Sequence, residues 1–75
     1  MKASDISDEQ MLAAVRRDIA ERRASIGACT WTLAEREGWP LKVAGAKLDV
    51  MMRRRGLVDG CNCGCRGDWT IVGET

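Results

Sequence analysis

The chain of 75 residues contains no histidine, tyrosine or phenylalanine, and it has a single proline. Without histidine it lacks the side chain that most often serves as a general base. It also has no glycine-rich phosphate loop and no serine beside a candidate base, so we expect no enzyme activity. No apolar run approaches the roughly 18 residues of a membrane span, which predicts a protein without a membrane-spanning helix.

The N-terminal residues also lack the apolar segment of a secretory signal. The expected compartment is therefore the cytoplasm, where the four cysteines would stay reduced. The net charge is only +1, but it is unevenly distributed. Residues 31–56 carry six basic and three acidic side chains, whereas residues 57–75 carry one basic and three acidic side chains. The positive charge thus gathers in the middle of the chain, where contact with phosphate groups would need it.

The first third of the chain predicts a flexible leader at residues 1–6, followed by a helix. Ser7 and Gln10 have the spacing of a capping box, which marks the start of that helix. Asp18 and Arg22 are spaced as an ion pair on its surface. The face expected in the core carries Met11, Leu12, Val15 and Ile19.

Two further helices follow, separated by a short corner. Thr32 and Glu35 form a second capping-box pattern, and Gly38 suits the left-handed end of that short helix. Pro40 suits the first turn of the third helix, which we expect from Leu41 to Arg55. Two helices joined by a turn of about four residues are typical of a helix-turn-helix.

The third helix divides into faces when its residues are projected at roughly 100° each. The face that points away from the core should meet solvent, and two valines lie among basic residues along the edge of that face. The predicted core face carries Leu41, Ala44, Leu48, Met51 and Met52. The predicted outer face and its edge carry Lys42, Val43, Ala46, Lys47, Asp49, Val50, Arg53 and Arg54.

Beyond Gly56 the hydrophobic pattern changes to the alternation that is typical of strands. Two short strands, one on each side of residues 60–67, predict a β-hairpin. Trp69 and Ile71 share one face of the second strand, so Trp69 should pack on the core. Another short strand is expected around Ala28. Trp31 is expected to cover the edge of the core beside the second helix.

This order of elements resembles the winged helix-turn-helix superfamily of DNA-binding proteins. The most specific matches are L-A-E-R-E-G at 33–38 and R-G-L-V at 55–58, a step common in bacterial and phage regulators. The resemblance implies an α+β fold, with a three-helix core followed by a β-hairpin wing, over residues 7–72, and a tail at 73–75. A weaker similarity links the cysteines of the wing to the small winged-helix proteins of ferrous-iron uptake, although their spacing is wider.

The resemblance further implies that the third helix enters the major groove of duplex DNA. Lysines near its start would contact phosphate or guanine, small apolar side chains would meet thymine methyl groups, and the arginines would bind phosphates. The residues predicted to bind DNA are Lys42, Val43, Ala46, Lys47, Val50, Arg53 and Arg54. A transcriptional regulator is the expected function. The alternative is a solvated amphipathic helix whose basic end favours the helix dipole.

The cysteines suggest a separate site. Cys61, Cys63 and Cys65 would place three sulfur atoms on one side of an extended segment, and Cys29 could supply a fourth. Four thiolates suit zinc or an iron–sulfur cluster, although structural zinc sites usually show C-x₂-C pairs. A redox role and a simple tight turn are the other interpretations of this segment.

The second functional hypothesis is a winged-helix adaptor that docks another protein. Its apolar patch would comprise Val43, Val50 and Trp39, and its cysteine-rich wing would sense metal or redox state. Regulators of the resembling family commonly act as dimers on two half-sites, but the sequence shows no interface for a homodimer.

Overall fold

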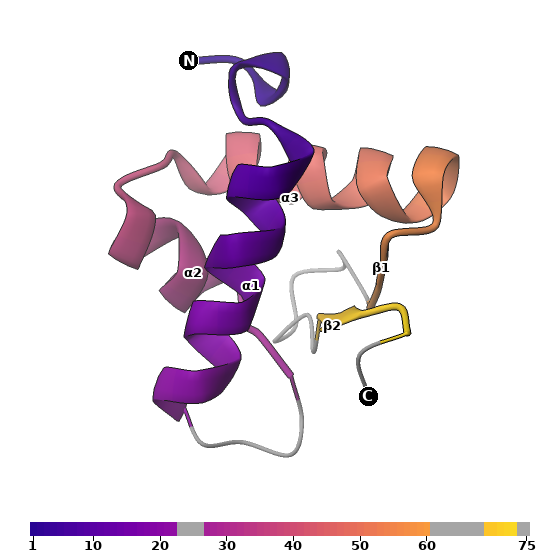
Figure 1. Ribbon diagram of the computed structural model, residues 1–75. Helices are drawn as coiled ribbons and strands as arrows, with labels where there is room; N and C mark the ends of the chain where they lie inside the picture. Colours follow the sequence, from indigo (N-terminus) through magenta and orange to yellow (C-terminus); the bar gives the residue numbers. More distant parts are fainter. Residues whose placement is uncertain (23–26, 61–68, 74–75) are drawn as a thin grey trace.

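The computed structural model describes residues 1–22, 27–60 and 69–73 (Figure 1). The described part holds three α-helices and one two-stranded antiparallel sheet, which is an α+β fold. The helices are α1 (Asp8–Arg22), α2 (Thr30–Glu37) and α3 (Leu41–Val50), and the strands are β1 (Val58–Asp59) and β2 (Thr70–Ile71). A 3-10 turn, η1 (Ala3–Asp5), precedes α1, and a π-helical turn, η2 (Met51–Arg55), extends α3. None of the described helices has the length and apolar character needed to cross a membrane.

Helix α1 begins at the predicted capping box. The backbone N–H of Gln10 donates to Ser7 Oγ at 3.0 Å, and the N–H of Ser7 donates to Gln10 Oε1 at 2.8 Å. Each side chain therefore satisfies a backbone donor that the first turn leaves unpaired. Met11 and Val15 are fully buried, as predicted, and they face the core together with Ile6.

The flexible leader predicted at residues 1–6 is wrong for Ala3–Ile6. These residues form η1, which packs against α3, and the side chain of Ile6 is only 1% exposed. The turn is held locally, because the N–H of Lys2 donates to the Asp5 carboxylate at 2.8 Å. An isoleucine just before the capping box can be buried against both neighbouring helices, which stabilises the turn that carries it.

Helix α2 ends as predicted, at the corner that leads into α3, but it does not begin where it was predicted to begin. Gly38 has the left-handed φ of 75°, and the N–H of Trp39 donates to the carbonyl of Ala34 at 2.9 Å. Helix α2 begins three residues earlier than expected, at Thr30 instead of Leu33, so Thr32 lies inside the helix and caps nothing. Pro40 immediately precedes α3, and its carbonyl accepts the first hydrogen bond of that helix.

Helix α3 and η2 form one continuous rod over residues 41–55. Ala44, Leu48 and Met51 are fully buried, as predicted, but Leu41 is 42% exposed because it lies on the first turn, at the free end of the rod. The rod ends in a wider turn, in which Gly56, with φ of 62°, donates its N–H to the carbonyl of Met51. Gly56 suits this position because a left-handed residue with a side chain would be strained.

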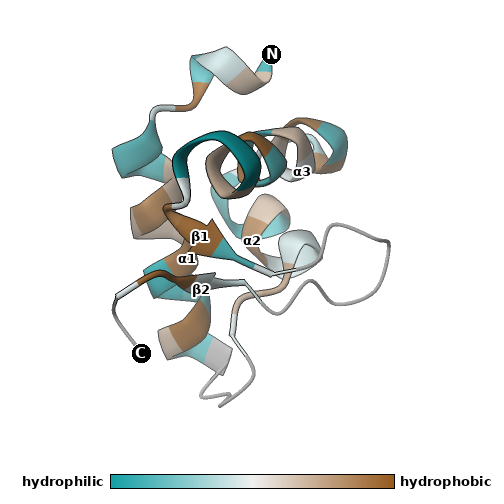
Figure 2. Ribbon diagram, turned by 90° about the vertical axis from the view of Figure 1, so that its right-hand side faces the viewer, coloured by the Kyte–Doolittle hydropathy of each residue, from teal (hydrophilic) through white to brown (hydrophobic). Residues whose placement is uncertain are grey.

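The predicted hairpin strands are present. Val58 pairs with Ile71 in an antiparallel register, and the residues that connect the strands lie outside the described part. Ala28 pairs with Trp69 through two backbone hydrogen bonds of 2.7 and 2.8 Å, at the place where a short strand was expected. The Trp69 side chain is fully buried, and Figure 2 shows β2 beside α1. The sheet therefore closes the open side of the three helices.

Candidate nucleic-acid interface

The outer face of the rod formed by α3 and η2 carries the exposed basic side chains Lys42, Arg53 and Arg54 that the sequence predicted. Lys42, Ala46 and Arg53 are exposed and Asp49 is partly exposed. Their spacings of four, three and four residues place them on one line along the helix. We call these four residues the outer stripe. Arg54, the next residue along, is also exposed.

Lys47 is not available on this surface. Its side chain is only 11% exposed, and its Nζ donates to Asp8 Oδ1 at 2.8 Å. The prediction that Lys47 contacts DNA is therefore corrected: η1 and the start of α1 cover this flank of α3 and supply the counter-charge. The long aliphatic part of a lysine can lie in an apolar contact while its ammonium group reaches a polar partner.

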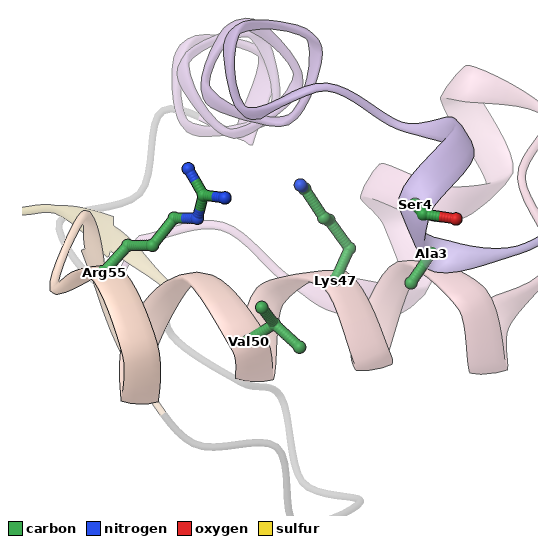
Figure 3. A pocket seen from close by; sticks show the side chains of 5 residues that line it. All are labelled: Ala3, Ser4, Lys47, Val50 and Arg55. Carbon is green, nitrogen blue, oxygen red and sulfur yellow. The ribbon is translucent and has the colours of Figure 1, made fainter.

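Asp8 holds a second cation of the rod. Arg55 Nη1 donates to Asp8 Oδ2 at 2.7 Å, so one carboxylate bridges Lys47 and Arg55. We call these three residues the Asp8 clamp. Figure 3 shows the Lys47 and Arg55 side chains rising from the same side of the rod formed by α3 and η2. In a regular α-helix, residues eight apart are rotated by about 80° from one another. The wider turn of η2 reduces that rotation and brings Arg55 into line with Lys47.

The Asp8 clamp changes the chemistry of its carboxylate. The hydrogen bond from Lys47, assisted by the positive charges of Lys47 and Arg55, holds the pKa of Asp8 below its usual 3.8, against a smaller opposing effect of desolvation. Asp8 is therefore ionised at neutral pH. It neutralises part of the charge that the sequence had assigned to the DNA-binding helix.

The two valines predicted at the interface lie elsewhere. Val43 is half-buried and packs against the hydrophobic core, as does Trp39. Val50 is half-buried and lines a hollow of about 390 Å³ together with Ala3, Ser4, Lys47 and Arg55 (Figure 3). Neither valine belongs to the outer stripe. Two of the three members of the apolar patch in the adaptor hypothesis are therefore partly buried against the core, and that hypothesis stays a prediction.

The tryptophans divide between core and surface. Trp69 is buried, as predicted, and its Nε1 donates to Thr30 Oγ1 at 2.7 Å. Trp31 is 60% exposed, so the expectation that it covers the core edge is wrong. The earlier start of α2 explains this, because it moves Trp31 onto the outer side of the helix.

The proposed metal site falls mostly outside the described residues, since Cys61, Cys63 and Cys65 belong to residues 61–68. Cys29 is described and buried, and its backbone precedes the first turn of α2. Among the described residues, no group of histidine, cysteine, aspartate and glutamate side chains could hold a metal ion. A cysteine-bound zinc or iron–sulfur cluster stays a prediction.

Sequence reasoning missed the most buried charge of the described chain. Asp18 is fully buried and accepts hydrogen bonds from the Cys29 N–H at 2.9 Å, from Thr32 Oγ1 at 2.9 Å and from Arg36 Nη1 at 2.5 Å. The predicted surface position of Asp18 is therefore wrong. A signal was present, because Asp18 lies on the same helical face as Met11 and Val15. Asp18 joins α1 to the start of α2 and so positions the helix that precedes α3.

Comparisons with protein-family models, with curated proteins and with solved structures found no match for this chain.

Proposed function

We propose that this chain is a small winged-helix protein that binds duplex DNA, with the outer stripe of α3 facing the major groove. Acting in this way, it would serve as a transcriptional regulator in the cytoplasm. The winged-helix interpretation is supported by the order of the described elements. A helix, a short paired segment at Ala28, two helices across a tight corner and an antiparallel strand pair follow one another.

The outer stripe is the observation that carries the proposal. It presents Lys42 and Arg53 about 11 residues apart on a rod roughly 20 Å long, with the small side chain of Ala46 between them. A small residue lets a helix approach the floor of the groove, where an alanine methyl group can contact thymine. Arg54 lies beside the stripe and can reach a phosphate.

The Asp8 clamp limits the number of cations that can take part. Lys47 and Arg55 would have to leave Asp8 before binding phosphate, so Lys42, Arg53 and Arg54 should dominate. Three phosphate contacts give a slope of log affinity against log salt of about −2.7. Affinity should then fall about 40-fold between 50 and 200 mM salt, which is a modest dependence for a DNA-binding protein.

The test is a fluorescence anisotropy titration of a labelled random-sequence duplex at these two salt concentrations. The double variant Lys42→Gln, Arg54→Gln should lower the affinity at 50 mM salt at least tenfold and flatten the slope to about −1. The control is Arg16→Gln, Arg17→Gln, which removes two exposed positive charges from α1 instead; because Arg17 pairs with Glu37, urea unfolding first checks that this variant is folded. Unmeasurable binding by the unmodified chain, or equal losses in the two double variants, would contradict the proposal.

A further inference from the structure

Asp49 is an acidic residue at the centre of the basic surface. It occupies the third position of the outer stripe, between Ala46 and Arg53, and its side chain is 32% exposed. Arg53, which is 73% exposed, donates its Nε to Asp49 Oδ1 at 2.8 Å. A carboxylate at this place repels phosphate, so it weakens general attraction to DNA. Its position needs an explanation other than affinity.

We infer that Asp49 is a specificity residue of the proposed DNA interface, and the inference rests on that proposed function. In the major groove, guanine presents two acceptors and thymine presents one, and a carboxylate is repelled by both. Cytosine presents its N4 amino group, from which an aspartate can accept a hydrogen bond. Adenine also presents an amino donor, N6, but beside its own N7 acceptor, whereas cytosine presents no acceptor of its own in the groove. Asp49 therefore prefers the cytosine of a G·C pair beneath the middle of α3 and disfavours guanine and thymine at that position.

Asp49 also orients the guanidinium of Arg53 through their hydrogen bond. The pair uses Nε of Arg53, so the N–H groups on Nη1 and Nη2 are not used in it. On random duplex Arg53 contacts phosphate, whereas at a selected site its guanidinium, held at one edge by Asp49, can present the other edge to O6 and N7 of guanine, which is the most frequent specific contact of arginine. The two residues are separated by about 6 Å along the helix, a distance of roughly two base-pair steps. Asp49 and Arg53 would thus read the same or neighbouring G·C pairs.

The experiment begins with selection of duplexes from a random pool by the unmodified chain. Affinities are then measured for the selected site, for that site with each G·C pair replaced by A·T, and for random duplex. Asp49→Ala should bind random duplex about threefold more tightly than the unmodified chain does, because a repulsive charge is gone. The preference for the selected site over random duplex should fall at least tenfold, with the loss concentrated at one or two G·C positions.

Glu21→Ala is the matched control, because it removes one exposed acidic charge from α1, outside the outer stripe. It should leave the preference between site and random duplex unchanged. Two results would overturn the inference while leaving DNA binding intact: equal changes in the two variants for all duplexes, or a pool in which no sequence is enriched. Failure of the unmodified chain to bind any duplex would instead remove the proposed function and this inference together.

Discussion

Replacing Asp18 with asparagine tests whether its buried carboxylate holds α2 in place. The three partners of Asp18 are all donors: the Cys29 N–H, the Thr32 hydroxyl and the Arg36 guanidinium. Asparagine has nearly the same shape, but it offers one acceptor oxygen and adds an amino group that meets donors. At least one buried hydrogen bond to a charged group is lost, at a cost of about 1.5–3 kcal/mol.

The upper limit of the expected loss in stability comes from the ion pair between Asp18 and Arg36. Removing one partner of a buried pair typically costs about 3–5 kcal/mol, but the side chain of Arg36 is 31% exposed and can regain water. We therefore expect Asp18→Asn to lower the free energy of unfolding by about 2–4 kcal/mol. A domain of this size is stable by roughly 4–11 kcal/mol, so the change is a large fraction of the total. The corresponding decrease in Tm is about 10–30 °C.

The measurement is urea unfolding at pH 7, followed by circular dichroism, with Asp49→Asn as the control. The control also replaces a paired aspartate, but its pair is exposed on α3 and should contribute less than about 0.5 kcal/mol. If Asp18→Asn costs less than 1 kcal/mol, or no more than the control, the carboxylate does not hold α2 and the reasoning fails.

Two further predictions concern the start of α1 and the corner before α3. Because the pKa of Asp8 is lowered in the folded chain, the Asp8 clamp stabilises the fold fully above pH 3.8 and less as the pH falls through the folded pKa. Asp8→Asn should therefore unfold more readily than the unmodified chain at pH 6 in urea, and the difference should disappear in acid; a difference that persists at pH 2 would show another cause. Gly38→Ala should lower the free energy of unfolding by about 1–2 kcal/mol, because the left-handed φ of 75° is strained by any side chain although nothing lies within 4 Å of the added methyl group. Urea titration would contradict this reasoning if the variant were as stable as the unmodified chain.

Features set by neighbouring residues were the ones that the sequence predicted well. The Ser7–Gln10 capping box and the glycine at the end of α2 depend on contacts within a few positions, so the pattern contains them. The buried side of α3 was also predicted at Ala44, Leu48 and Met51, because helical periodicity alone selects it.

Features that depend on distant partners were not predicted. Lys47 was placed at the DNA interface because its partner Asp8 lies 39 positions earlier, at the start of another helix. Asp18 was placed on the surface because its partners belong to α2 and to the residue that precedes it, and the start of α2 was predicted at the wrong place. In both cases a charged side chain was assigned to solvent, and the packing of another element supplied its counter-charge.

The pairing of Ala28 with Trp69 has a consequence for synthesis of the protein. The ribosome adds roughly 5–20 residues per second from the N-terminus, so all three helices are made before the tryptophan that fills the space between them. Until Trp69 leaves the ribosomal exit tunnel, the nascent chain exposes the apolar surface that Trp69 will cover and the backbone groups of Ala28 that will pair with it. Folding of this domain should therefore finish only after Trp69 has left the exit tunnel.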